Sequence, residues 1–236
     1  MPVDLIEKKS KTSLPIHLVE EGRLAEAALD PAGRAWAEAN GFSGEAGRTL
    51  VLPGGNGAMA GVAFGTGKGG GTLALGALAK ALPAGDWHFA TPPQNPGLAA
   101  LALKLGGYAF TRYGKAGGRV LRIALPAGAD GGHVQRVGDG VFLARDLVNT
   151  PTSDMGPQAL EQAARRLADA HKASVSVIKG DDLLKKNFPM IHAVGRAAVE
   201  APRLIDLAWG PKSAPKVTLV GKGVCFDTGG LDIKPA

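Results

Sequence analysis

The residues best suited to chemistry are concentrated in the last twenty positions of the sequence, VTLVGKGVCFDTGGLDIKPA. Two lysines and two aspartates, Lys222, Asp227, Asp232 and Lys234, occur there within thirteen positions. An apolar run at residues 217–220 leads into them, and glycines separate the charges. The spacing alone is compatible with a reactive site or with a glycine-rich loop that carries solvated charges.

These residue types are the ones that a metal site would need. An aspartate carboxylate is a ligand for hard cations. A lysine beside a metal can lose its proton and offer a neutral amine, whereas a second lysine that stays charged can stabilise an oxyanion. Glycines allow the backbone to approach an ion closely, and they occur at 221, 223, 229 and 230.

The segment GKGVCFDTGGLDIKP resembles the signature of the leucyl aminopeptidase family, the two-metal exopeptidases of the M17 type, whose pattern is close to GKGVTFDSGGxxIKP. The resemblance implies that Lys222 gives an amine to one metal and that Asp227 bridges both. It implies that Lys234 is the catalytic lysine that polarises the scissile carbonyl. The expected cofactors are two divalent ions, manganese or zinc, and the expected reaction releases N-terminal amino acids, leucine-like ones preferred, from peptides. Asp232 has no part in the family pattern.

Two further segments support the resemblance. NTPTSDMGP at residues 149–157 resembles the opening of the family's catalytic domain, and AVGRAAVEAPRLIDLAW at residues 193–209 is similar to the run that leads towards the metal strand. The family's remaining metal carboxylates and its assisting arginine follow the IKP motif, so we assign the activity to the complete enzyme. The resemblance also implies a homo-oligomer, typically a hexamer.

Composition excludes several other classes of protein. The 236 residues are 45% hydrophobic and 20% charged, as expected for a globular protein. The single cysteine, Cys225, excludes an internal disulfide and favours a reducing, cytoplasmic location. No signal peptide or membrane span is expected. The net charge of +6 comes from scattered basic residues without an aromatic stacking surface, so nucleic-acid binding is not expected.

The first 130 residues alternate short β-like runs with helical runs. This order predicts the α/β class, with an N-terminal sheet that has helices on both faces. The expected strands are residues 14–19, 49–52, 59–64, 87–90, 108–113 and 119–125. The expected helices are residues 25–40, with a possible break at Asp30–Pro31, 73–82 and 98–105.

A linker and a helix separate this half from the rest. Residues 128–132 (GADGG) are turn-forming, and apolar residues recur with helical spacing over 133–148. We therefore predict a non-catalytic α/β domain at residues 1–128, a linker helix at 129–150, and the first part of an α/β metallo-aminopeptidase catalytic domain at 151–236.

Within residues 151–236, several elements are expected. A helix should begin at Pro157, with Asp154 or a neighbour as its cap, and run to His171. Shorter elements are a strand at residues 175–178, a helix at 181–186, a mixed segment at 188–194, and strands at 204–209 and 217–220 that pair as a hairpin.

Two other functions remain open from the sequence. Gly65, Gly67 and Gly70 satisfy G-x-G-x-x-G after an expected strand, and Asp86 follows about twenty residues later, as in nucleotide-dependent oxidoreductases. A flexible turn in a glycine-rich chain explains the same pattern. The other possibility is a non-catalytic assembly module. The five histidines have no HxxH or HExxH spacing, and no G-x-S-x-G motif occurs, so a histidine zinc site and a serine triad are not expected.

Overall fold

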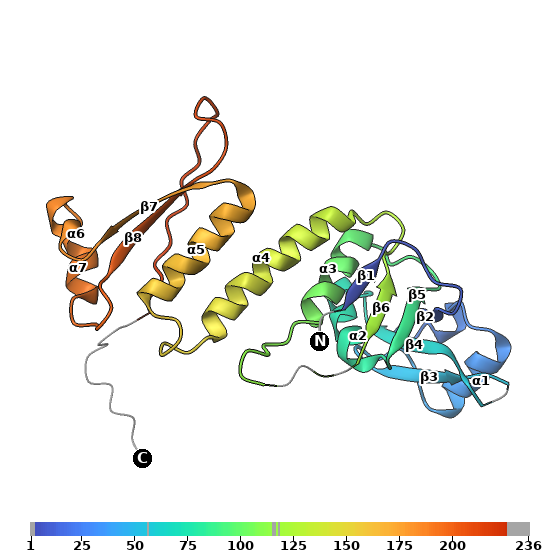
Figure 1. The fold of residues 1–236 in the computed structure, drawn as a ribbon. Coiled ribbons are helices and arrows are strands. Elements are labelled where there is room, and N and C mark those ends of the chain that lie inside the picture. Colours follow the sequence, from blue (N-terminus) through green and yellow to red (C-terminus); the bar gives the residue numbers. More distant parts are fainter. Residues whose placement is uncertain (1–2, 56, 115–116, 118, 226–236) are drawn as a thin grey trace, which may run out of the picture. The chain divides into compact units, whose positions relative to one another are not determined.

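The computed structural model describes residues 3–55, 57–114, 117 and 119–225 (Figure 1). The chain divides into two compact units, Met1–Asp146 and Leu147–Ala236, which are described separately below. In the described ranges, no helix has both the length and the apolar character to cross a bilayer.

The first unit is built on a six-stranded sheet with the order β1-β6-β5-β2-β4-β3. All neighbouring pairs are parallel except β3 and β4, which are antiparallel. The strands are β1 (Asp4–Ile6), β2 (Leu14–Glu20), β3 (Thr49–Pro53), β4 (Met59–Gly67), β5 (Gly85–Phe89) and β6 (Leu121–Ala124). The helices are η1 (Leu24–Glu26), α1 (Pro31–Ala39), η2 (Thr72–Ala77), α2 (Leu78–Ala81), α3 (Pro96–Gly106) and α4 (Gly131–Asn149), of which the last three residues of α4 belong to the second unit.

Helices cover both faces of this sheet, which confirms the expected α/β architecture. The residues of β4 contribute alternately to the two faces of the sheet, because successive side chains of a strand point to opposite sides. Val62 and Phe64 belong to the core beneath η2, α2 and α3, which also holds Leu78, Trp87 and Leu103. Ala63 belongs to the opposite core, beneath α1, with Val19, Ala37, Phe42 and Leu52.

Local sequence explains where the main helices of this unit begin. The Asp30 carboxylate accepts a 2.6 Å hydrogen bond from Gly33 N, and Pro31 is the first residue of α1. Asn95 caps α3 in the same way, accepting from Leu98 N at 3.0 Å ahead of Pro96. The helix expected at residues 25–40 is divided at the break expected at Asp30–Pro31: η1 covers Leu24–Glu26, and α1 begins afresh at Pro31.

A second correction concerns the strand expected at residues 108–113, which is absent from the described residues of that segment. The aromatic residues that suggested this strand pack against other side chains and do not belong to a hydrogen-bonded strand pair. The Tyr108 ring lies 5.2 Å from that of Phe142, and its hydroxyl donates to Asp146 Oδ1 at 2.7 Å. The Phe110 and Tyr113 rings are 5.8 Å apart.

The second unit contains a two-stranded antiparallel sheet of β7 (Ser174–Lys179) and β8 (Arg203–Ala208). Its helices are α5 (Pro157–His171), α6 (Asp182–Lys185) and α7 (Pro189–Gly195). The bounds of α5 confirm those expected from the sequence. The expected hairpin is wrong, because β8 pairs with β7 and not with residues 217–220.

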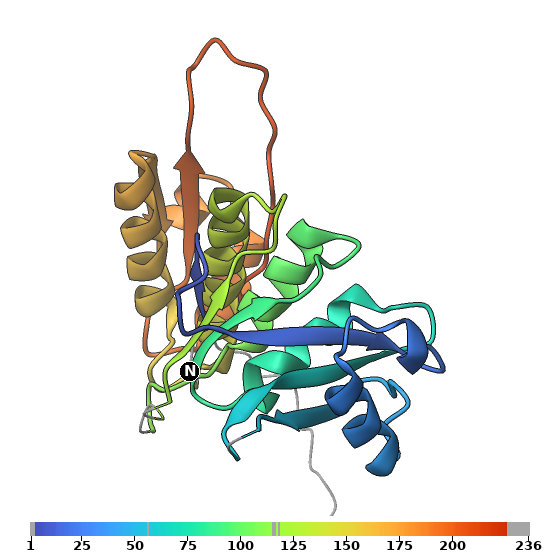
Figure 2. The ribbon, with the colours of Figure 1, turned by 90° about the vertical axis from the view of Figure 1, so that its right-hand side faces the viewer.

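Residues 217–220 form no strand, and the chain after β8 follows an irregular course (Figure 2). Val217, Leu219 and Val220 are 84%, 92% and 93% exposed. A β-type sequence forms a strand only when a neighbouring strand satisfies its backbone groups, and the described part of this chain provides none.

Candidate functional site

Of the three site residues expected from the sequence, Lys222 is described, and Asp227 and Lys234 lie outside the described residues. Lys222 is exposed in the irregular segment that follows residues 217–220. No described carboxylate forms an ion pair with it, so its amine is available to a ligand. Among the described residues, no group of three or more His, Cys, Asp or Glu side chains could hold a metal.

The loop that carries Lys222 contacts helix α5 through Gly223. A Cβ added at Gly223 would lie 2.7 Å from Leu160 Cδ2, so a larger residue would force the loop and the helix apart. Leu160 is a half-buried residue of α5. The absence of a side chain at 223 therefore lets the segment next to Lys222 lie against the helix.

Cys225 follows in the same loop and is half-buried, with its Sγ 3.9 Å from Gly223 O. Burial raises the pKa of the thiol, and the nearby charge of Glu200 raises it further. The thiol therefore stays protonated near neutral pH. This agrees with a packing role and not with a nucleophile, which would need a lowered pKa.

The start of α5 is stabilised by a residue that the sequence did not indicate. The N-cap residue is Gly156, and the Glu200 carboxylate accepts a 2.7 Å hydrogen bond from Gln158 N. A side chain at 156 would collide with this carboxylate, since an added Cβ would lie 2.7 Å from Glu200 Oε2. The expected Asp154 cap is thus replaced by a carboxylate 42 positions away from Gln158, which no local pattern could identify.

A second long-range contact ties α5 to β8. Glu161 accepts hydrogen bonds from Arg203 Nη1 at 2.5 Å and from Arg165 Nε at 2.8 Å. The Arg165 and Arg203 guanidinium groups hold the pKa of Glu161 below its usual range. Glu161 and Glu200 therefore fix the helix that contacts the Lys222 loop.

The glycine-rich motif in the first unit has a structural explanation. Gly65 and Gly67 belong to β4, and a Cβ at Gly65 would lie only 2.0 Å from Glu45 O. Gly69 N donates to Glu20 Oε1 at 3.1 Å, so a pyrophosphate at this loop would meet a carboxylate. Asp86 pairs with Arg122 at 2.7 Å on the neighbouring strand β6. The nucleotide-dependent oxidoreductase is therefore not favoured.

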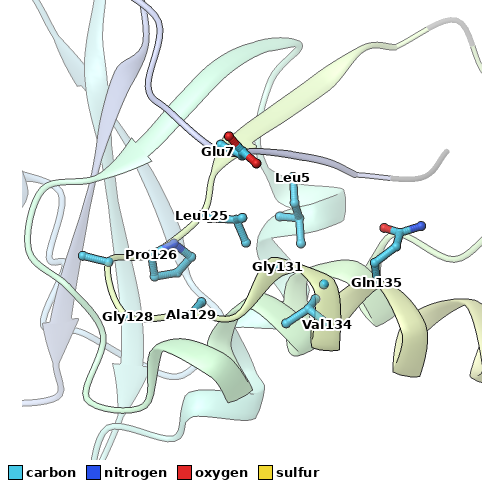
Figure 3. Close-up of a pocket in the computed structure, with 11 residues that line it drawn as sticks. Leu5, Glu7, Leu125, Pro126, Gly128, Ala129, Gly131, Val134 and Gln135 are labelled. Carbon is cyan, nitrogen blue, oxygen red and sulfur yellow. The ribbon is translucent and has the colours of Figure 1, made fainter.

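A cavity of about 490 Å³ lies at the ends of β1 and β6 beside the first turns of α4 (Figure 3). Leu5, Leu125 and Val134 supply the apolar part of its wall, and Glu7, Gln135 and backbone atoms supply the polar part. The Gln135 side chain is engaged on both sides: its Nε2 donates to Asp139 Oδ1 at 2.9 Å, and its Oε1 accepts from Lys104 Nζ at 2.9 Å. These hydrogen bonds engage both ends of the Gln135 amide, and Glu7 is the charged side chain of the lining.

Comparison with known proteins identifies the family. Residues 14–126 match the model of the M17 aminopeptidase N-terminal domain, and residues 142–236 match that of the cytosol aminopeptidase family catalytic domain. The chain belongs to the M17 cytosol aminopeptidase family. The agreement of two separate models, in this order along the chain, extends the resemblance seen in the C-terminal motif to nearly the whole sequence.

Individual M17 relatives give the same result. The chain is 36% identical over 185 residues to a probable cytosol aminopeptidase of Mycobacterium bovis, covering 69% of this chain and 36% of that protein. It is 43% identical over 110 residues to one of Roseiflexus castenholzii, covering 46% and 22%. The crystal structure of the Coxiella burnetii cytosol aminopeptidase matches with a TM-score of 0.87 and 38% identity, covering 98% of this chain and 51% of that chain.

More distant solved structures share the fold. The bottromycin maturation enzyme BotP, solved in complex with Mn, matches with a TM-score of 0.68 at 22% identity over 86% of this chain and 46% of that chain. The chain thus spans about half the length of the solved relatives and a smaller share of the curated ones.

Proposed function

We propose that the full-length protein is a metal-dependent aminopeptidase that releases N-terminal amino acids, preferably leucine-like ones, from peptides. The observation that carries this proposal is the match of both halves of the chain to the two M17 domains, together with the motif GKGVCFDTGGLDIKP. We further propose that the enzyme acts in the cytoplasm as a homo-oligomer, a hexamer by family resemblance.

The residues present suit a pair of divalent ions, manganese or zinc. Lys222 has an exposed side chain without a carboxylate partner among the described residues, and Asp227 adds a carboxylate five positions later. An amine and a carboxylate are both ligands for these metals. The remaining ligands would come from the part of the longer enzyme that follows this motif.

Each residue then has a defined task in the reaction. Lys222 would have to give up a proton to bind an ion as an amine, and Asp227 would supply a carboxylate shared by the pair. Lys234 stays charged and offsets the negative charge that develops on the carbonyl oxygen of the substrate, a contribution of about 3 kcal/mol for a well-placed donor. When bound, the divalent ions supply Lewis-acid chemistry and an activated water.

The proposal is tested by hydrolysis of leucine amide with the full-length protein. EDTA should abolish the activity, and added Mn²⁺ or Zn²⁺ should restore it. Lys222→Ala and Asp227→Asn should each lower the bound metal measured by elemental analysis, whereas Lys234→Ala should keep the metal and lose at least 100-fold in kcat. Lys216→Ala is the matched control, because Lys216 is an exposed lysine outside the motif. Hydrolysis that survives complete metal removal would refute the metal-dependent mechanism.

The pH dependence gives a second test of the role of Lys222. Because a lysine binds a metal only as a neutral amine, protons compete with the metal, and activity should rise from acid to mildly alkaline pH. The check is a profile of kcat/KM for leucine amide at saturating metal. A maximum below pH 7 would contradict the assignment.

A further inference from the structure

A second cavity, of about 160 Å³, lies at the point where the sheet topology of the first unit reverses. β2 has parallel neighbours on both sides, β4 on one and β5 on the other. The chain leaves β2 towards α1 on one face of the sheet, and it leaves β4 towards η2 and α2 on the other face. In open α/β sheets, ligands bind in the crevice outside the carboxyl ends of strands at such a switch point.

The cavity is formed by segments that lie far apart in the sequence. Leu18 and Glu20 come from the end of β2, and Thr66 comes from the end of β4. Gly70 and Thr72 belong to the glycine-rich turn and the start of η2 that follow β4, and residues 91–94 follow β5. All these segments belong to the first unit, so the cavity is complete within it.

One side of the cavity carries a negative charge that is held in place. The Glu20 Oε1 atom accepts from Gly69 N at 3.1 Å, and Oε2 lies 3.5 Å from Arg23 Nη1 in a loose ion pair. The carboxylate is therefore fixed but keeps accepting capacity. A carboxylate is the natural partner of an ammonium group, and it repels phosphate.

The rest of the polar lining is rich in hydrogen-bond donors. In the described part of the chain, no acceptor engages the N–H of Gly70, and the Thr72 and Thr91 hydroxyls have no partner. The Gln94 amide likewise makes no hydrogen bond to a described residue. All four groups line the same cavity, so they can donate to an anionic group of a ligand bound there.

The remaining wall is apolar and small. Leu75 is 1% exposed, and Leu18 and Pro93 lie beside it in the lining. A volume of 160 Å³ is below the roughly 300 Å³ at which drug-sized ligand sites begin. A ligand of this site must be small, with an ammonium, an anionic group and a short apolar part.

We propose that this cavity binds a free α-amino acid with a short apolar side chain. Glu20 receives the α-ammonium, the donors of Gly70, Thr72 and Gln94 receive the carboxylate, and the Leu18–Leu75 wall receives the side chain. If the full-length protein is an aminopeptidase, a released amino acid is a product that can bind at this cavity, outside the catalytic domain. A regulatory role for this binding rests on the proposed function.

The test uses L-valine as the probe, titrated by calorimetry into the full-length protein carrying Lys222→Ala, so that the proposed metal loop is disabled. We expect saturable binding of one valine per chain. Glu20→Gln should weaken it at least tenfold, because glutamine keeps the oxygen that accepts from Gly69 N and loses only the charge. Glu21→Gln, the same change at the next residue and outside the cavity lining, should leave it unchanged.

Two analogues separate the contributions of the charged groups. 3-Methylbutanoate lacks the ammonium and 2-methylpropylamine lacks the carboxylate, and each should bind at least tenfold more weakly than valine. The proposal is overturned if valine does not bind saturably, if Glu20→Gln binds it as well as the parent protein, or if D-ribose saturates the cavity in its place. Binding is measured without hydrolysis, so its failure is distinct from failure of the aminopeptidase activity.

Discussion

At the residue scale, two carboxylates that are distant in sequence from their partners organise the helix beside the Lys222 loop. Glu200 caps α5 from 42 positions away, and Glu161 joins α5 to Arg203. Neither acid stands out in the sequence, because Glu200 lies far from the helix start that it caps and Glu161 is one polar residue among others within α5. By contrast, Asp30 and Asn95 stand directly before a proline at a helix start, and this local pattern is visible without a structure.

We predict that Glu161→Gln lowers the free energy of unfolding at pH 7 by about 2 kcal/mol, the size of a hydrogen bond to a charged group. The pKa of Glu161 is lowered in the folded state by Arg165 and Arg203, so its contribution exists above the usual glutamate pKa and is lost as the pH falls through the lowered value. In urea unfolding curves the difference between the variant and the parent should therefore begin to shrink below the usual glutamate pKa of about 4.3 and vanish below the lowered one.

The matched control is Asp169→Asn, on the exposed side of the same helix. It should change stability by less than about 0.5 kcal/mol at either pH. A loss in Glu161→Gln that persists undiminished at pH 3 would show that the carboxylate charge is not the cause.

At the element scale, hydrophobic periodicity predicted the helices and most strands. Where it failed, the presence or absence of a neighbouring strand determined whether a segment forms a strand. β1 has only three residues, and it exists because Asp4, Leu5 and Ile6 pair with β6. Residues 108–113 have β-type composition, but Tyr108 packs on Phe142 of α4. Which strands become neighbours depends on long-range packing, and a single sequence does not display it.

Two glycines of α4 provide a test of element packing. A Cβ at Gly138 would lie 2.6 Å from Lys104 Cγ, in a side chain that is only 10% exposed and held by Gln135 and Asp139. A Cβ at Gly140 would meet nothing within 4 Å. We predict that Gly140→Ala stabilises the first unit by about 1 kcal/mol through helix propensity alone.

Gly138→Ala gains the same propensity but must displace a buried lysine stem, so it should be less stable than Gly140→Ala by about 2 kcal/mol or more. Thermal unfolding of the two variants side by side measures the difference. Equal stabilisation by both substitutions would mean that Lys104 does not fill the space beside residue 138.

At the scale of the whole molecule, the family could be predicted from one motif, and the structure of the site could not. The resemblance of this motif to the family signature indicated Lys222, Asp227 and Lys234, and of these the structure describes Lys222 alone. The geometry of a metal centre depends on ligands brought together from several segments. The relatives are about twice as long as this chain, and the described residues bring no such group together.

We predict that residues 217–220 form a strand in the full-length protein. Val217, Leu219 and Val220 are almost fully exposed, and a contiguous apolar run of this kind is typical of a surface that a neighbour covers. Hydrogen exchange should show protected amides at 217–220 in the full-length protein and unprotected amides in the 236-residue chain. Rapid exchange in both would refute the prediction.

The pairing of β1 with β6 also affects how the first unit is assembled during synthesis. Asp4 lies beside Arg122 in the sheet, so β1 is translated long before its partner β6 and stays unpaired until almost the whole unit has been made. Contacts of such long sequence separation slow folding, because loop closure precedes the gain from pairing. A nascent chain halted before residue 121 would leave β5 without its outer neighbour, and such an intermediate is the stage at which chaperone binding or aggregation is most expected.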